Sequence, residues 1–155
     1  MDDLVTWLHQ QLDEDGRAAG HAQPGPWHIG KAVDPTRPCT IRTFPAAGDV
    51  ADRIRWVDAE HIARHYPARV LREVEAKRRA IDLHGIVWRE IGWLQRDGDE
   101  LVEADGQLPV CAICVPAYAS FFATRADVPV GPCVTVRLLA VAYADRPGYR
   151  EEWQP

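Results

Sequence analysis

The sequence predicts an α+β fold in one small domain that spans residues 1–155. Two stretches have the apolar spacing of amphipathic helices, and between and after them lie short strand-like runs bounded by proline and glycine. A pair of cysteines follows one strand-like run, as in a zinc knuckle. We therefore expect a helix-hairpin-helix part over residues 1–84 and a zinc-binding part, of zinc-knuckle or treble-clef type, over residues 85–155.

The first predicted element is an N-terminal helix. Its apolar residues recur at spacings of three and four, which places them on one helix face: Leu4, Trp7, Leu8 and Leu12. An acidic turn and Gly16 follow, and glycine commonly stands just beyond a helix C-terminus. We expect a helix that ends near Gly16.

A short hairpin and a long central helix are expected next. Proline and glycine are frequent over residues 20–50, which favours turns and two short strands at Trp27–Ile29 and Cys39–Phe44. Residues 58–65 fit one or two helical turns. Pro67 suits the first position of a further helix, where a missing N–H is no loss, and its apolar stripe predicts a helix to about His84.

Residues 86–105 fit two interpretations. Val87, Ile91 and Leu94 are compatible with a continuing helix, whereas Gly92 and the RDGDE turn favour two strands, and we prefer strands. Residues 118–124 are strand-like. The last helix is predicted to open at Cys133 and to stop before Pro147.

Three cysteines carry the predicted chemistry. Cys111 and Cys114 have the C-x2-C spacing with which a tight turn brings two sulfurs to one ion. Cys133 falls at a predicted helix start, where free N–H groups and the helix dipole stabilise a thiolate. The sequence therefore predicts zinc bound by these three residues. The alternatives are a disulfide or redox pair, and buried cysteines without a ligand.

His84 is the predicted fourth ligand, because it ends the longest helix and would complete a Cys3His site. Its alternatives are an open coordination position filled by water and a histidine that caps the helix. A site closed by four protein ligands is structural, since catalytic zinc normally keeps one position open. Cys39 is expected in the core.

His61 and His65 form a weaker, second metal hypothesis. They lie four residues apart and share a helix face, as the ligands of H-E-x-x-H proteins do. Glu60 precedes the first histidine instead of following it, so the general base of a metalloprotease is missing. Packing or solvated histidines are the preferred interpretation.

Composition excludes several classes of protein. A formal net charge of −5 argues against nonspecific coating of nucleic acid, and the basic run at residues 77–79 fits a solvated helix face. No apolar run approaches the roughly 20 residues that a membrane helix needs, and the acidic N-terminus is unlike a secretory signal. We expect a cytoplasmic protein without membrane contact, whose tryptophans mostly anchor the core.

Several strings resemble an uncharacterised family, a domain of unknown function in streptomycetes, related actinobacteria and their phages: MDDLVTWLHQQLDED at the N-terminus, Pro24 to Trp27, His61 to Leu71, the C-x2-C pair, and Pro132 to Trp153. The resemblance implies an origin in mobile or phage-related DNA and supports a metal site, but it implies no substrate. The chain departs from the family pattern at Val134, Val136 and Arg146, the last of which replaces a histidine and leaves His84 as the better fourth ligand.

We therefore expect a non-enzymatic, zinc-stabilised interaction module that binds an unknown macromolecule, a protein in preference to nucleic acid. No nucleophile elbow or phosphate-binding loop points to a reaction. The alternatives are a metal-dependent enzyme, with an open zinc position or a site at His61 and His65, and a thiol redox sensor that uses Cys111 and Cys114.

Overall fold

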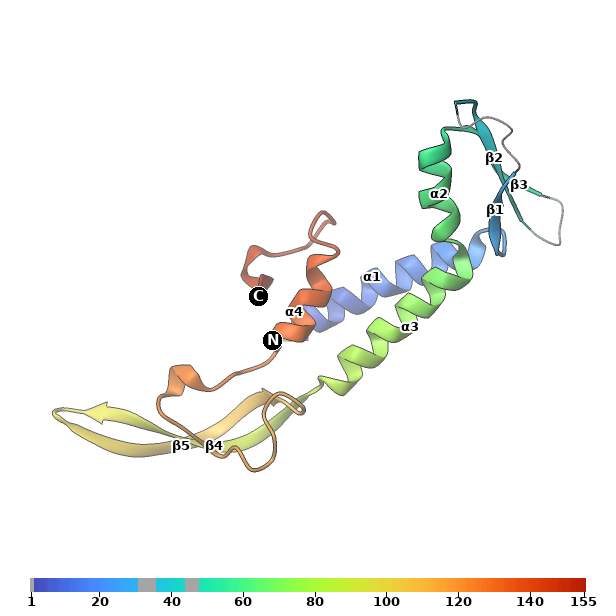
Figure 1. The fold of residues 1–155 in the computed structure, drawn as a ribbon. Coiled ribbons are helices and arrows are strands. Elements are labelled where there is room, and N and C mark those ends of the chain that lie inside the picture. The colour runs from blue at the N-terminus through green and yellow to red at the C-terminus, as the bar shows by residue number, and fades with distance from the viewer. Residues whose placement is uncertain (1, 31–35, 44–47) are drawn as a thin grey trace. The chain divides into compact units, whose positions relative to one another are not determined.

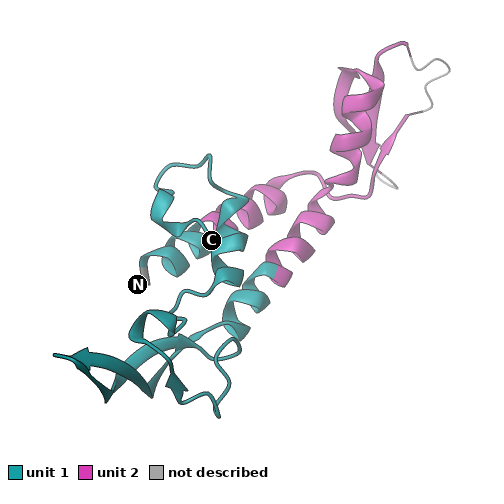
Figure 2. Cartoon of the chain, turned by 60° about the vertical axis from the view of Figure 1, so that its left-hand side comes forward, with its two compact units in different colours: residues 1–10, 77–155 teal, residues 11–76 magenta. Residues whose placement is uncertain are grey.

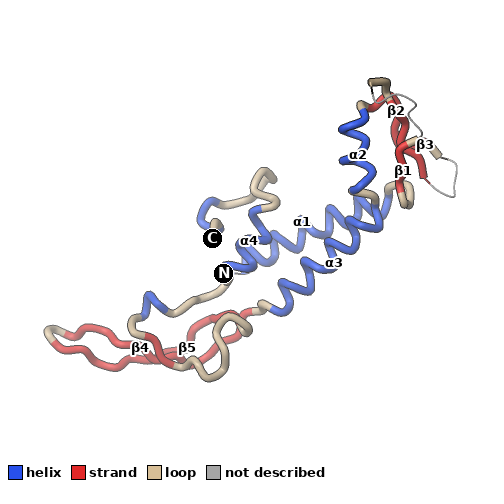
Figure 3. The backbone as a smooth tube through the Cα atoms, viewed as in Figure 1, coloured by secondary structure: helices blue, strands red, loops and turns tan. Residues whose placement is uncertain are grey.

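The structure is a computed structural model that describes residues 2–30, 36–43 and 48–155. It confirms the α+β prediction (Figures 1 and 3). The helices are α1 (Asp2–His21), α2 (Trp56–Arg64), α3 (Pro67–Leu83) and α4 (Val134–Val141), and two single-turn 3-10 helices are η1 (Arg125–Asp127) and η2 (Glu151–Trp153). The strands are β1 (Trp27–Ile29), β2 (Cys39–Thr43), β3 (Asp49–Ile54), β4 (Ile86–Asp97), β5 (Glu100–Cys111) and β6 (Phe121–Phe122).

The chain forms two compact units (Figure 2). Unit 1 comprises residues 1–10 and 77–155, and unit 2 comprises residues 11–76. Helices α1 and α3 each contribute residues to both units. The division into parts 1–84 and 85–155 of a single domain stays a prediction.

Unit 2 contains an antiparallel sheet in the order β1-β2-β3, with α2 packed on β1 and β2. The register pairs Trp27 with Thr43 and Cys39 with Ile54. Its small core is formed by buried side chains of the sheet and of α2: Cys39, Ile41 and Ala59. The predicted hairpin is therefore present, although Phe44 lies outside the described residues.

Unit 1 contains the long hairpin of β4 and β5, which pair along their whole length. The turn between them has Gly98 with φ of 60°, the backbone conformation that glycine adopts without steric cost in a two-residue hairpin turn. The strand interpretation of residues 86–105 is therefore right. One face of the hairpin is buried with the segment that follows β5, in a core of Ile91, Leu108, Val110, Val115 and Val128.

The C-terminal segment of unit 1 packs through aromatic rings. Trp7 near the start of α1 lies 5.7 Å from Tyr149 and 5.2 Å from Trp153, measured between ring centroids. The Trp7 indole also donates a hydrogen bond to the carbonyl of Pro147, at 3.1 Å. Lys77 donates to the Tyr143 hydroxyl at 3.0 Å. The Trp7 contacts hold the residues after α4 against the N-terminal turns of α1, and Lys77 ties Tyr143 to α3.

Several local predictions need correction. Helix α1 continues past Gly16 to His21, because the residues after the glycine include two alanines, which favour helix, and Ala19 is buried. Strand β3 was not predicted, because all of its residues are exposed or half-buried and it therefore has no alternation of buried apolar residues. Helix α4 ends at Val141, before a series of tight turns, rather than near Pro147.

The tryptophans divide between core and surface. Trp7 and Trp153 are buried, as predicted for core anchors, whereas Trp88 is 66% exposed. Trp88 lies three residues before the buried Ile91, so the two side chains point to opposite faces of β4. In the described part of the chain, no helix is both long and apolar enough to span a lipid bilayer.

Candidate metal centre

Four side chains of unit 1 converge on one point. They are His84, directly after α3; Cys111, the last residue of β5; Cys114, in the turn that follows; and Cys133, the N-cap of α4. Their four ligand atoms all lie within 4.8 Å of one another. These are the residues in which the sequence predicts a zinc site, and they form a group that could hold a metal ion.

The distances fit a tetrahedral metal site. The Nδ1 atom of His84 lies 3.4 Å from Sγ of Cys111, 3.5 Å from Sγ of Cys114 and 3.5 Å from Sγ of Cys133. Zinc bonds of about 2.3 Å to sulfur and about 2.0 Å to nitrogen, at tetrahedral angles, separate the two atoms by about 3.5 Å. The nitrogen therefore stands where the fourth vertex of a Cys3His tetrahedron would be.

Hydrogen bonding alone does not account for this arrangement. An Nδ1–H group has one proton and points it well at one acceptor, because hydrogen bonds weaken steeply as they bend. Here one nitrogen is nearly equidistant from three sulfurs. Equal distances are what bonding to a common central ion produces.

The end of α3 directs His84 to this point. Its backbone N–H still donates to the carbonyl of Ala80, at 3.1 Å, so the main chain remains helical up to this residue. The next N–H, of Gly85, donates to Asp82 at 3.2 Å and ends the helix. The ring of His84 faces the sulfurs, whereas a ring that capped the helix would face backbone carbonyl oxygens.

The C-x2-C turn is held at the base of the hairpin. Cys111 pairs with Ile86, the first residue of β4, and the N–H of Ala112 donates to the carbonyl of Gly85 at 2.9 Å. Within the turn, the N–H of Cys114 points at Sγ of Cys111 at 3.4 Å. Such N–H···S contacts stabilise the thiolate form that binds metal.

Cys133 reaches the cluster through a segment that lies along β5. Val130 forms an isolated antiparallel bridge with Val110, and the N–H of Gly131 donates to the carbonyl of Pro109 at 2.8 Å. A Cβ atom on Gly131 would lie 2.9 Å from Cγ1 of Ile86, so only glycine fits this approach without a shift.

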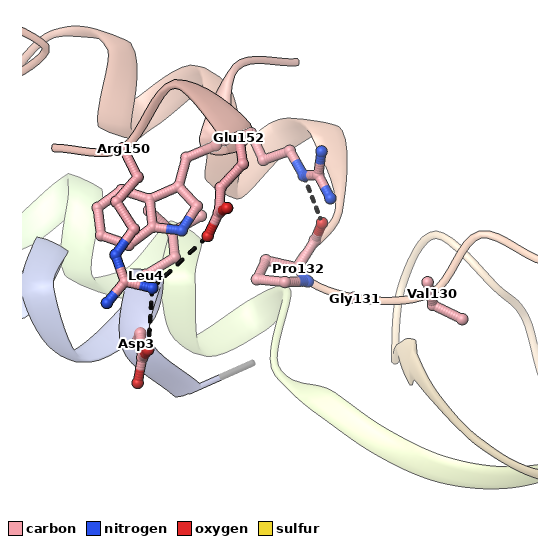
Figure 4. A pocket seen from close by; sticks show the side chains of 9 residues that line it. Asp3, Leu4, Val130, Gly131, Pro132, Arg150 and Glu152 are labelled. Carbon is pink, nitrogen blue, oxygen red and sulfur yellow. Dashed lines mark hydrogen bonds and ion pairs between the residues drawn. The ribbon is translucent and has the colours of Figure 1, made fainter.

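Arg137 supports the same segment from α4. Its Nε donates to the carbonyl of Pro132 at 3.1 Å, the residue before Cys133 (Figure 4). This is a supporting residue that the sequence analysis did not single out. Its position four residues after Cys133, one helical turn along α4, is the signal that could have indicated it.

A cavity of about 390 Å³ adjoins this support, and Figure 4 shows its lining. Arg150 pairs there with Asp3 at 3.2 Å and with Glu152 at 3.5 Å. Arg137 also donates to the carbonyl of Gln154, at 3.4 Å. The side chains of Arg137 and Arg150 thus both have partners within the chain. The cavity is lined by residues near the C-terminus and by the start of α1.

The pKa values of the thiols reflect their crowding. Burial raises the pKa of the Cys114 thiol to about 12, with hydrogen bonds to Cys111 and Cys133 adding to the effect. The residue as a whole is exposed, but its sulfur faces the cluster. Burial also acts to raise the pKa of Cys133, yet the N–H of Val136, the two neighbouring thiols and the N–H of Thr135 outweigh it and lower that pKa. Cys133 therefore loses its proton more readily than Cys114.

The predicted second site lies in unit 2. The rings of His61 and His65 are 4.4 Å apart, and Nδ1 of His65 lies 2.8 Å from the carbonyl oxygen of His61. Both residues are exposed. That hydrogen bond occupies one ring nitrogen of His65, and a metal site at this pair stays a prediction.

The remaining cysteine, Cys39, is buried in the core of unit 2, as expected. Its thiol donates to the carbonyl of Ile54 at 3.3 Å. All four cysteines are free thiols, so the structure contains no disulfide among them.

Comparison with known proteins places the chain in a family. All of its residues, 1–155, match a family of unknown function, DUF6221. The chain belongs to this family. No curated protein and no solved structure matches this DUF6221 chain. The resemblance to an uncharacterised family is thereby confirmed at the level of the family, and the motifs and the actinobacterial or phage origin stay predictions.

Proposed function

We propose that the four-residue cluster binds one zinc ion and that the ion is structural. The near-equal distances from His84 Nδ1 to three sulfurs are the observation that carries this proposal. Three thiolates and one imidazole form a donor set that suits Zn²⁺ in tetrahedral geometry, whereas Mg²⁺ and Ca²⁺ prefer oxygen. Four protein ligands leave no position for a reacting water, so the zinc serves folding rather than catalysis.

The test is metal analysis of the purified protein together with single replacements. We expect one zinc per chain, lost in Cys111→Ser, Cys114→Ser and Cys133→Ser. His84→Ala should weaken binding, and His84→Cys, which restores a four-ligand set, should recover it. Zinc-free wild-type protein would overturn the proposal. Full zinc retention in His84→Ala would remove the fourth ligand and favour an open site of the catalytic type.

We further propose that the zinc-stabilised part acts as an interaction module for another protein. Two large apolar side chains adjoin the ligands: Ile113 is 57% exposed between Cys111 and Cys114, and Val134 is 55% exposed directly after Cys133. Exposed apolar side chains at a rigid centre suit a protein partner. The net charge of −5 disfavours the phosphate backbone of nucleic acid. An origin in phage or mobile DNA is compatible with such an accessory role.

Crosslinking in a native host, followed by identification of the captured macromolecules, tests the interaction role. Ile113→Asp and Val134→Asp should reduce capture while leaving zinc bound. Val57→Asp is the matched control, because Val57 is 64% exposed but belongs to unit 2. Capture that is equal in all variants, or absent with the wild type, would contradict the interaction role. Rapid thiol modification of zinc-free protein would support the redox alternative instead.

A further inference from the structure

A second cavity of unit 1 lies beside the metal centre and has a different character. Its volume is about 360 Å³, within the range of small-molecule sites. Most of its lining is apolar and comes from α1, α3, β4, α4 and the segment before α4: Val5, Ile81, Ile86, Pro132 and Val136. Among the described residues, only Thr6 and His84 bring polar side chains to it, and none of those that line it is charged. The site therefore suits an uncharged molecule.

His84 connects the cavity with the metal centre. Its Nδ1 faces the three sulfurs, so the other ring nitrogen, Nε2, is the polar atom that the residue can offer elsewhere. A histidine that binds metal through one nitrogen almost always donates the N–H of the other nitrogen to a carboxylate, a carbonyl or a water.

Within the described residues, Nε2 of His84 has no hydrogen-bond partner. It is also absent from the buried polar atoms without a partner, so the protein does not seal it off. His84 is one of the residues that line the cavity, and an open donor on a lining residue can orient a ligand that carries an acceptor.

From this geometry we propose that the cavity binds a small, neutral, mainly apolar molecule with one hydrogen-bond acceptor, such as a carbonyl, placed against Nε2–H of His84. The apolar walls supply affinity by excluding water from the ligand, and the single donor fixes its orientation. The proposed apolar binding rests on the lining of the cavity. The orienting role of Nε2 rests on the proposed zinc site, because the ion holds Nδ1 and thereby fixes the proton on Nε2.

The experiment uses full-length zinc-loaded protein and two probes of similar shape, acetophenone, which has a carbonyl acceptor, and ethylbenzene, which has none. Backbone amide and histidine-ring nitrogen NMR signals are followed during titration, and zinc per chain is measured on the same sample. We expect saturable shifts at Thr6, Gly85 and Val136 with both probes. The Nε2 signal of His84 should shift with acetophenone and stay in place with ethylbenzene.

Val5→Phe should weaken binding of both probes at least about tenfold, because the added ring fills the space they need. Val141→Phe is the control, since Val141 lies on α4, is 43% exposed and does not line the cavity. Shifts that do not saturate, or that map away from the lining residues, would overturn the proposal even if Val5→Phe did not fold. An Nε2 signal that does not shift with acetophenone would overturn the proposed role of His84. Wild-type protein that is purified without zinc and still binds both probes would overturn the zinc proposal and leave the cavity proposal in place.

Discussion

The sheet of unit 2 and the hairpin base of unit 1 both bury cysteine, with opposite consequences. Cys39 in unit 2 is 5% exposed, and its thiol donates a hydrogen bond to a carbonyl of the neighbouring strand. Cys111 and Cys133 in unit 1 are 0% and 7% exposed, and their sulfurs meet an imidazole and a third thiol. Burial is therefore the same in both regions. What separates a core cysteine from a candidate metal ligand is the convergence of further donor atoms.

The two regions also differ in the contacts that hold their segments together. The sheet of unit 2 packs on α2 through side chains that are apolar or paired with backbone. The candidate metal centre joins His84, the C-x2-C turn and Cys133 through side-chain atoms that a shared ion would hold together. Unit 1 should therefore depend on metal in a way that unit 2 does not.

The largest expected effect is that of metal removal. Chelation should unfold residues 111–133, because structural zinc contributes on the order of 10 kcal/mol to folding. Hydrogen exchange read by mass spectrometry should show loss of protection there, with protection kept at β2 and β3. Equal loss in both units, or none in residues 111–133, would contradict the difference between them.

Matched cysteine replacements test the difference between the buried cysteines of the two units. Cys133→Ser should abolish zinc binding and cost several kcal/mol of folding free energy. Cys39→Ser keeps a donor for the carbonyl of Ile54 and should cost only about 1 kcal/mol. Urea unfolding and zinc content measure both variants. A Cys39→Ser protein without zinc would show that unit 2 supports the metal centre.

Glycine replacements should have smaller effects. Gly131→Ala places a Cβ 2.9 Å from Cγ1 of Ile86, so either the segment that carries Cys133 or the Ile86 side chain must shift, at a cost of about 1 to 3 kcal/mol. Zinc affinity should fall with it. Gly20→Ala, in α1 with nothing within 4 Å of the added atom, should instead stabilise by up to about 1 kcal/mol. The stability of both variants is measured by thermal unfolding, and their zinc affinity by competition with a zinc chelator. Equal stability and equal zinc affinity in the two variants would argue against a tight approach at Gly131.

The smallest effect concerns an exposed carboxyl of unit 2. The hydroxyl of Thr40, 2.8 Å away, and the N–H of Arg53 lower the pKa of Asp52 below its ordinary value near 3.8. Because the folded value lies below the unfolded one, the contribution to stability is present above pH 3.8 and is lost as the pH falls through the folded value. Thr40→Val should raise the Asp52 pKa toward its ordinary value in an NMR titration. Thr40→Ser, which keeps the hydroxyl, should leave it low, and an unchanged pKa in Thr40→Val would exclude this hydrogen bond as the cause.

Much of the fold and the membership of the candidate site could be predicted from the sequence. Pro67 begins α3 as expected, and the RDGDE turn joins two strands. The C-x2-C pair and a cysteine at a helix start are short-range patterns, so each can be recognised from a few neighbouring residues. The strand β3 could not be predicted, because exposed edge residues carry no apolar period.

The side chains available for a metal centre follow from the order of residues alone, because ligand type and local spacing are properties of the chain. Folding adds three features: Nδ1 of His84 faces the sulfurs, Cys39 lies in the core of unit 2, and His84 also lines an apolar cavity. Those features depend on the packing of segments that are far apart in sequence. No local period or spacing encodes the distances between them.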